Sequence, residues 1–322
     1  MSSVLPRPVR PLGRVVLAVA ALLSVVGLSA CSSQAATAPA GTGDASARSI
    51  THELGTTKIE GRPARVVALE FSFVQTLDQL KVTPVGIADD DDAARVPQLL
   101  GRKIDYTSVG TRLEPNLELV SSLQPDLIIA DSTRHAAIYP QLGAIAPTIV
   151  LNSWEGSYQD IKDSAVTIAD ALGDRAKGEA AVAEHEKRMK EIAEKIPAGS
   201  DGRILLAVAT PDAMTLHTSS AFTGSVFKAL GLKPAIEATD PLESGVGLER
   251  LVAVNPDVLL VATDGPGTVY DEWRANSAWA GISAVASKAV HEVDRNQFAR
   301  FRGLHTAEVI AGDVVQKLSG DR

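Results

Sequence analysis

The 322-residue sequence is poor in aromatic residues and contains a single cysteine. Aromatic side chains make up 4% of it, which disfavours a site for neutral or cationic ligands that rely on aromatic contacts. One cysteine, Cys31, excludes an intrachain disulfide and a thiolate metal cluster. After Met1 the only methionines are Met189 and Met214, which gives little support for a haem axial pair. The tyrosines and histidines lack the compact spacing that direct ferric coordination requires.

The sequence also lacks the common hydrolase motifs. Neither a Gly-x-Ser-x-Gly nucleophile motif nor a His-Glu-x-x-His zinc pair occurs. We therefore expect a protein that is not an enzyme, with an exported hydrolase as the less favoured alternative. The formal net charge of −8 disfavours a nucleic-acid partner. With 45% hydrophobic residues the chain is globular, and its length predicts two lobes rather than one core.

The first 30 residues have the features of a signal peptide. Three arginines and no acidic residue precede an apolar run over residues 15–28, which is too short to span a bilayer comfortably. The run ends in Leu-Ser-Ala-Cys, similar to a lipoprotein signal, so we expect Cys31 to become the acylated first residue, with palmitate or a related chain. Cleavage would change the formal net charge from −8 to −11. The alternative is an ordinary secretory signal in which Cys31 is incidental.

The composition predicts the domain organisation. Residues 31–55 are expected to form a flexible tether, because residues 32–47 are mostly Ser, Ala, Thr, Gly and Pro. An N-terminal lobe over 56–156, a helical linker over 157–200 and a C-terminal lobe over 201–322 follow. The protein is thus expected on the extracytoplasmic face of the cell membrane, held by its lipid anchor.

Short apolar runs alternate with helical spacing along both halves, which predicts α/β lobes with largely parallel sheets. A helix is expected over 73–80. The expected strands cover residues 65–69, 84–88, 127–130, 148–151 and 204–209.

An internal repeat relates the two halves. Residues 116–129 (NLELVSSLQPDLII) match residues 247–260 (GLERLVAVNPDVLL) at a constant offset. Each copy reads as a short helix, a Pro-Asp turn and a buried strand, so the two lobes should be similar. Between them, Asp174 is a candidate N-cap for a proline-free helix over 175–196, about 33 Å long at 1.5 Å per residue. Such a rod predicts limited closure of the lobes.

Arginines stand at positions where a ligand is expected. Arg134 follows the strand over 127–130, and ligands of open α/β sheets sit beyond such strand ends. Arg112 precedes the first repeat helix. Arg300 and Arg302 are two residues apart, so an extended segment would point both to one face, with Arg295 nearby. Because a guanidinium pairs bidentately with a carboxylate, the set favours a polyanionic ligand; singly, each is also compatible with a solvated surface charge.

The motif VGTRLEPNLE at 109–118, followed by PDLIIAD at 125–131, resembles the ABC-transporter binding proteins for siderophores, haem and vitamin B12. This resemblance covers residues 56–320 and implies two α/β lobes joined by one long rigid helix, the class III periplasmic-binding-protein fold. The stretches at 132–135, 138–139, 145–148 and 294–303 (DRNQFARFRG) are similar to the branch for ferric dicitrate and citrate-type siderophores such as staphyloferrin A.

The resemblance implies a monomeric binding protein without a cofactor, whose ligand is an Fe(III)-siderophore and whose partner is an ABC permease with its ATPase. Iron would be held by the siderophore, with no direct metal ligand from the protein. A ferric hydroxamate, haem or another iron chelate remains an alternative ligand, and a sensor lipoprotein an alternative role. The expected ligand-binding residues are Arg112, Arg134, His217, Arg295, Arg300 and Arg302.

The resemblance also assigns roles to individual side chains near the repeat. Glu118 and Glu249 share one register and are expected to dock on the permease, although an acid in the first helical turn also complements the helix dipole. His217 is as consistent with a surface or capping role as with ligand contact. For His135 a structural hydrogen bond is favoured, and Tyr139 is a weak candidate for the rim of the site.

Overall fold

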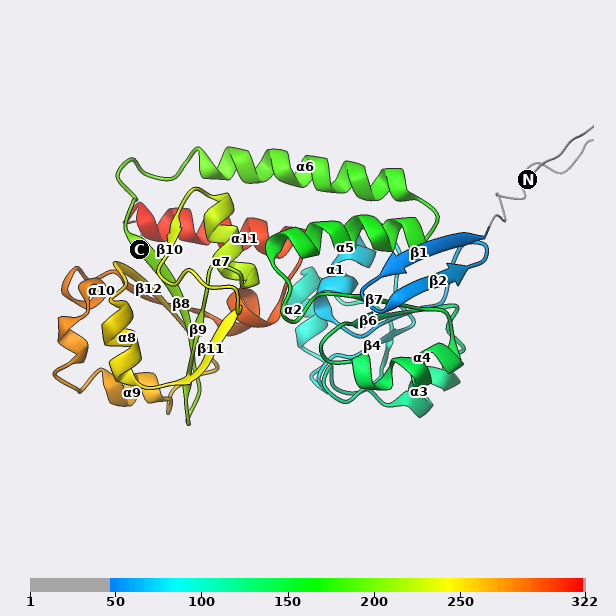
Figure 1. The fold of residues 1–322 in the computed structure, drawn as a ribbon, viewed down its shortest axis with the longest axis horizontal. Helices are drawn as coiled ribbons and strands as arrows, with labels where there is room; N and C mark the ends of the chain where they lie inside the picture. Colours follow the sequence, from blue (N-terminus) through cyan, green and yellow to red (C-terminus); the bar gives the residue numbers. More distant parts are fainter. Residues whose placement is uncertain (1–46, 321–322) are drawn as a thin grey trace, which may run out of the picture. The chain divides into compact units, whose positions relative to one another are not determined.

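The computed structural model describes residues 47–320 and folds them into two α/β lobes (Figure 1). The predicted signal peptide, Cys31 and most of the predicted tether lie outside the described residues. Within residues 47–320, no helix has both the length and the apolar character needed to cross a bilayer.

The N-terminal lobe contains a five-stranded, fully parallel sheet in the order β5-β4-β3-β6-β7. All five residues of β6 are buried, which explains why this strand reads as a continuous apolar run. The strands are β3 (Val66–Ala68), β4 (Gly86–Ile87), β5 (Thr107–Ser108), β6 (Leu127–Asp131) and β7 (Thr148–Leu151). The helices are α1 (Phe71–Gln79), α2 (Arg95–Leu100), α3 (Leu117–Ser122), the 3₁₀ turn η1 (Ala136–Ile138) and α4 (Tyr139–Ile145).

The C-terminal lobe has a mixed sheet rather than a parallel one. Strands β8, β12 and β13 are parallel, but β9 and β11 join antiparallel at one edge, and β10 pairs with β8. The strands are β8 (Arg203–Ala209), β9 (Met214–His217), β10 (Lys233–Pro234), β11 (Leu242–Val246), β12 (Val258–Thr263) and β13 (Val290–Asp294). The helices are α7 (Phe222–Ala229), α8 (Leu248–Val254), α9 (Val269–Trp273), η2 (Trp279–Gly281), α10 (Ser283–Ala286), the π-helix η3 (Asn296–Arg300) and α11 (Leu304–Leu318).

The predicted repeat is present as α3 followed by β6 and as α8 followed by β12. Its Pro-Asp turns have a structural role. The carboxylate of Asp126 accepts hydrogen bonds from the backbone N–H groups of Ala64 and Arg65, both at 2.8 Å, just before β3. Asp257 accepts one from the N–H of Arg203 at 2.7 Å, at the start of β8. In each lobe the repeat aspartate therefore fixes the beginning of the neighbouring parallel strand.

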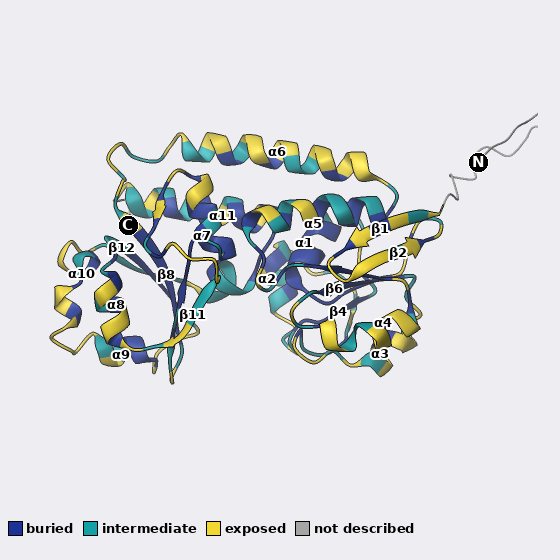
Figure 2. Ribbon diagram, viewed as in Figure 1, coloured by how far each residue is buried: buried dark blue, intermediate teal, exposed yellow. Residues whose placement is uncertain are grey.

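Two antiparallel helices, α5 (Tyr158–Ala171) and α6 (Arg175–Ala193), connect the lobes, and α6 is the long helix that runs across both (Figure 1). Side chains near the start of α5 pack in the core of the C-terminal lobe, and those near its end pack in the N-terminal core. The outer face of α6 is exposed (Figure 2). The helix ends three residues earlier than predicted, and Asp174 occupies the N-cap position without a side-chain cap hydrogen bond.

A second connection joins the two lobes. Phe301 belongs to the core cluster of the N-terminal lobe and meets Phe71 edge-to-face at 5.4 Å between ring centres. The amide of Gln75 exchanges two 3.1 Å hydrogen bonds with Thr306, one to its hydroxyl and one from its backbone N–H. The lobes are thus connected both by the helical linker and by the contacts that Phe301 and Thr306, at the start of α11, make with α1.

The predicted tether is wrong from Arg48 onward, because β1 (Arg48–His52) and β2 (Gly55–Ile59) form an antiparallel hairpin. Ile50 and Ile59 are buried in the N-terminal core, and the N–H of Glu53 donates to the carbonyl of Val150 in β7. Two apolar anchors in a polar stretch are too weak a pattern to indicate a strand pair by composition.

Candidate functional site

A cavity of about 300 Å³ lies between the lobes and is lined by all six of the predicted ligand-binding side chains. Arg112, Arg134 and Trp154 come from the N-terminal lobe. The C-terminal lobe supplies the remaining lining residues, which are Val208, Thr215, His217, Leu242, Ser244, Arg295, Ala299, Arg300 and Arg302. Five guanidinium groups therefore meet at one cavity, although the corresponding residues are up to 190 positions apart in the sequence.

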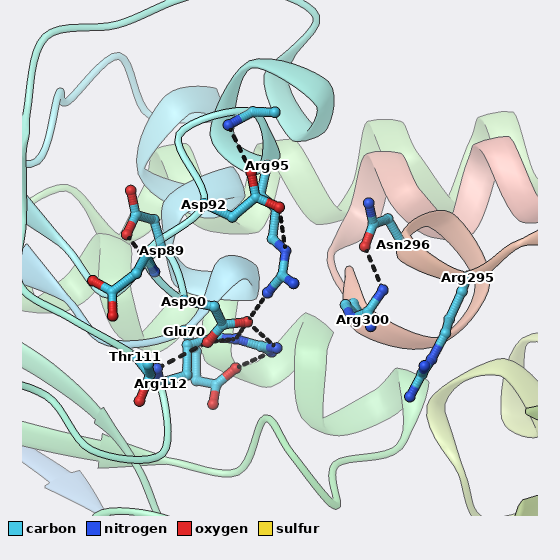
Figure 3. A network of polar contacts seen from close by, with 12 residues as sticks. Glu70, Asp89, Asp90, Asp92, Arg95, Thr111, Arg112, Arg295, Asn296 and Arg300 are labelled. Carbon is cyan, nitrogen blue, oxygen red and sulfur yellow. Dashed lines mark hydrogen bonds and ion pairs between the residues drawn. The ribbon is translucent and has the colours of Figure 1, made fainter. Parts of the chain in front are cut away.

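Arg112 is held in a buried network (Figure 3). Its Nε and Nη2 donate to the carboxylate of Asp90 at 2.8–3.1 Å, and its Nη1 donates to Glu70 at 3.2 Å. Burial opposes the charge of Asp90, but hydrogen bonds and the positive charge from Arg112, with a contribution from Arg95, hold the pKa of Asp90 below its usual value. Most of the donors of Arg112 are thus already paired within the protein.

Two further arginines lie over the ring of Trp154. The guanidinium of Arg134 stacks 3.9 Å from the centre of the Trp154 ring and also pairs with Glu70. Arg302 lies 5.1 Å from the same ring and is 5% exposed. Burial lowers the pKa of Arg302 to about 10. The negative charge of Glu70 opposes this lowering, and the positive charges of Arg112 and Arg134 add to it. Within residues 47–320 no carboxylate forms an ion pair with Arg302, so its charge is available to an anion.

Arg295 and Arg300 lie across from the Arg112 network (Figure 3). Both oxygens of Asp264 accept from Arg300, at 2.5 and 2.6 Å, and one also accepts from Arg295 at 2.5 Å. These hydrogen bonds lower the pKa of Asp264. Arg300 ends the π-helix η3, so the predicted extended segment for Arg300 and Arg302 is wrong, although Phe301, between them, has an extended backbone. The π-turn places Arg300 and Arg302 on the same cavity nonetheless.

The two histidines near the site have different roles. His217 ends β9, is 8% exposed and lines the cavity; within the described chain its Nδ1 is buried without a hydrogen-bond partner. Burial, with a contribution from Arg302, lowers the pKa of His217 to about 3, so the ring is neutral. His135 is fully buried: its Nδ1 accepts from the N–H of Asp131, so its Nε2 donates to the carbonyl of Arg112, both at 2.8 Å. The structural role favoured for His135 is confirmed, and it fixes the loop of Arg112.

Sequence reasoning missed three side chains of this site. Glu70 and Asp264 are two of the acids that pair with its arginines, and Trp154 is its aromatic surface. Each follows the carboxyl end of a strand within three residues, β3, β12 and β7 respectively, which is the position where the sheet topology predicts ligand contacts. Applying that rule to acids and aromatics, as it was applied to Arg134, would have found them. Tyr139 lies instead against His52, 5.7 Å between ring centres, and does not line the cavity.

Glu118 and Glu249 occupy the first turns of α3 and α8 and are both exposed. Over residues 47–320 neither carboxylate takes part in an ion pair. The two glutamates occupy equivalent positions in the two copies of the repeat. They are free for a contact outside the chain. In the same described range, no three His, Cys, Asp or Glu side chains are grouped so as to hold a metal ion.

Comparison with known proteins gives the family. The model of the periplasmic binding protein family matches residues 66–296. The Fe(3+)-citrate-binding protein YfmC of Bacillus subtilis is 42% identical over 92% of this chain and 94% of its own length. The Fe(3+) dicitrate-binding periplasmic protein FecB of Escherichia coli is 39% identical over 84% of this chain and 90% of its own. The fold matches Staphylococcus aureus SirA complexed with staphyloferrin B, with a TM-score of 0.73, 23% identity and coverage of 84% and 98%.

The predicted class III fold and the resemblance read from the motifs are both confirmed by these matches. The chain belongs to the periplasmic binding protein family.

Proposed function

We propose that this protein captures a ferric siderophore, an anionic citrate-type complex, in the cavity between its lobes and delivers it to an ABC permease for iron uptake. The observation that carries the proposal is the meeting of five arginines at one cavity, with the buried cation Arg302 lacking a carboxylate partner among residues 47–320. A ferric citrate complex presents several carboxylates, which match guanidinium groups in charge and planar geometry. The relatives named for ferric citrate and ferric dicitrate support the same ligand class.

The cavity is suited to holding the complex rather than the iron ion. Within the described chain its lining contains no Asp, Glu, Tyr or Cys, and His217 is the only side chain there of a metal-ligating kind. Iron is therefore cargo that keeps the oxygen ligands of its chelator. The protein binds the outer carboxylates through Arg302, Arg134 and Arg300, and one ring or chain of the chelator packs on Trp154.

Other ligands fit this cavity less well. Met189 and Met214 are both buried in cores of the C-terminal lobe and cannot reach a haem iron in the cavity. A hydroxamate complex, neutral or cationic, would meet five arginines and a single aromatic ring. The family is one of binding proteins, so the hydrolase alternative is discarded and the chain is a binding protein rather than an enzyme.

Delivery requires a docking surface and a place at the membrane. Glu118 and Glu249 supply one exposed acid per lobe, in matching positions for two related halves of a permease that works with its ATPase. Acylation of Cys31 would hold the protein on the extracytoplasmic face of the membrane, where it acts as a monomer. The sequence before residue 47 supports this anchoring through its signal-like run and small-residue composition.

A tryptophan fluorescence titration tests the ligand. The chain from residue 32 onward retains the whole described fold and is titrated with ferric citrate, a ferric hydroxamate and haem. Trp154 lines the cavity, whereas Trp273 and Trp279 pack in a core of the C-terminal lobe, so Trp154→Phe is the control that assigns quenching to the site. Saturable quenching by ferric citrate alone supports the proposal. Preference for the hydroxamate or haem contradicts the carboxylate ligand, and no response to any of the three contradicts the binding of an iron chelate.

A further inference from the structure

Asp264 occupies hydrogen-bond donors that a ligand carboxylate would need. Its two oxygens accept from Nη1 and Nη2 of Arg300 at 2.5 and 2.6 Å, which is the bidentate, fork-like pairing of a carboxylate with a guanidinium. A third hydrogen bond, 2.5 Å long, comes from Nη1 of Arg295. Both arginines line the cavity, but Asp264 does not. The acid thus reaches the arginines from outside the cavity wall.

We propose that Asp264 is an exchangeable internal counter-ion that a ligand carboxylate displaces from Arg300 and Arg295, and that it thereby sets which anions the C-terminal half of the site accepts. The inference rests on the proposed binding of a carboxylate-bearing ferric complex. Asp264 itself does not bind the ligand; it competes with the ligand for the N–H donors of Arg300 and Arg295.

A comparison with Glu70 shows why Asp264 is the exchangeable acid. Glu70 pairs with Arg112 and Arg134 in the other lobe, but its side chain is 1% exposed and lies between β3 and α1, where removal would leave a buried gap. The side chain of Asp264 is 51% exposed. Glu70 is therefore a fixed part of the site, whereas Asp264 can rotate into solvent without breaking a core contact.

The loop around Asp264 is exposed to solvent. Asp264 follows the last residue of β12 and precedes Gly265-Pro266-Gly267. Gly265 and Gly267 have φ values of +136° and +87°, and a Cβ at either would meet nothing within 4 Å, so the loop stands in open space. A carboxylate on this loop can leave Arg300 at the cost of its ion pairs alone.

The positive charges of Arg295 and Arg300 explain why Asp264 would favour carboxylate ligands over other ligands. Burial, followed by the charge of Arg300, lowers the pKa of Arg295, so the two cations repel each other and Asp264 relieves that repulsion. A ligand that presents a carboxylate fork replaces the three lost hydrogen bonds. A neutral ligand, or an anion that cannot form the fork, loses them without replacement. Asp264 therefore weakens binding of every ligand but weakens it least for carboxylate complexes.

The test combines affinity with thermal stability. Asp264→Asn keeps the shape of the side chain and removes its charge. Asp313→Asn is the matched control, since Asp313 pairs with Lys317 on α11 in the same lobe and does not line the cavity. Ferric citrate affinity is measured by fluorescence titration and the melting temperature by differential scanning fluorimetry, with and without ferric citrate; free citrate and phosphate serve as competitors.

The expected result for Asp264→Asn has three parts. Ferric citrate binds roughly three- to tenfold more tightly than to wild type, the range of a partly exposed ion pair. The melting temperature without ligand falls, because Arg295 and Arg300 are left unneutralised. Free citrate and phosphate compete more effectively than with wild type. Asp313→Asn leaves the affinity unchanged, and the gain shrinks when Arg300→Ala is combined with Asp264→Asn.

Other results overturn the inference. Weaker binding by Asp264→Asn would mean that Asp264 holds the arginines in position for the ligand, and an unchanged affinity would mean that it does not compete. In both cases the proposed function still stands, provided that the wild-type protein binds ferric citrate. If wild type does not bind ferric citrate, the proposed function fails, and the inference fails with it.

Discussion

Arg302 and Trp154 line the cavity together: the guanidinium carbon of Arg302 lies 5.1 Å from the middle of the indole ring. The other arginines of the cavity are paired with Glu70, Asp90 or Asp264, whereas within residues 47–320 Arg302 has no carboxylate partner. A buried, unpaired cation is costly to the folded protein and correspondingly attractive to an anion. The burial that lowers its pKa to about 10 leaves it charged at neutral pH.

Arg302→Met should weaken ferric citrate binding and raise the melting temperature at once. Loss of a charge-assisted hydrogen bond costs about 1.5–3 kcal/mol of binding, while removal of an unpaired buried charge stabilises the unliganded fold. Titration and scanning fluorimetry measure the two effects. Arg300→Ala is the comparison and should cost less affinity, because Asp264 already engages Arg300. Wild-type affinity in Arg302→Met contradicts the central role of this residue.

Arg112→Ala should act mainly on stability. Its removal leaves Glu70 with one partner and breaks the network with Asp90, both inside the protein (Figure 3). Breaking a buried ion pair from one side costs about 3–5 kcal/mol of unfolding free energy. Urea denaturation measures it, and Arg102→Ala is the control in the same lobe, because Arg102 pairs with Asp78 at the surface and should change stability by at most about 1 kcal/mol. Equal midpoints for the two variants would show that the network contributes little.

His217 should make the stability of the protein depend on acid. Its pKa in the folded state is about 3, against an ordinary value of 6.5, so between these values the unfolded chain binds a proton that the folded protein does not. Stability is therefore complete above about pH 6.5 and falls as the pH drops towards 3, by up to about 1.4 kcal/mol per pH unit for this group.

His217→Gln should reduce that dependence. Urea unfolding of wild type and variant at pH 7 and pH 5 gives the difference, and comparison of the two proteins cancels the contributions of His52 and His135, whose pKa values burial also lowers. Identical losses of stability in both proteins would mean that His217 can be protonated in the fold. Ligand affinity between pH 6 and 8 should not vary through His217, because the ring stays neutral there.

The elements that could be predicted from the sequence are those that are buried on one face or on both faces, because such burial leaves a regular apolar pattern along the chain. Strand β6 reads as an apolar run because it is buried on both faces, and the repeat was visible because α3–β6 and α8–β12 share both a register and a turn aspartate. Arg134 could be placed at the site because it follows a strand end directly. Such features depend on neighbours in the chain and on one rule of sheet topology.

The remaining features depend on contacts between distant residues. Arg134 and Glu70 are 64 positions apart, and Arg300 and Asp264 are 36 apart, so no local pattern indicates that these acids occupy the arginines of the site. The π-helix is another such case: it is closed by the hydrogen bond from the N–H of Phe301 to the carbonyl of Asn296, and Phe301 is fixed by its packing on Phe71 in the other lobe. The sequence therefore predicted which cations line the cavity, but not which of them are already paired.

The double variant Glu118→Ala with Glu249→Ala should abolish iron uptake by cells and leave ferric citrate binding unchanged. Both carboxylates are exposed in the first turns of α3 and α8, and neither lines the cavity, so their only expected loss is the contact with the permease. Uptake of radiolabelled ferric citrate is measured in cells that depend on this protein, and binding is measured on the purified variant.

Glu60→Ala with Glu292→Ala is the matched control, since it removes the same charge, one exposed acid from each half of the chain, at positions outside the repeat. It should transport iron like wild type. Each single variant should retain part of the uptake, because one lobe can still dock. Normal uptake by the double variant would reduce Glu118 and Glu249 to acids that complement their helix dipoles, and loss of ligand binding would show that they act on the site from a distance.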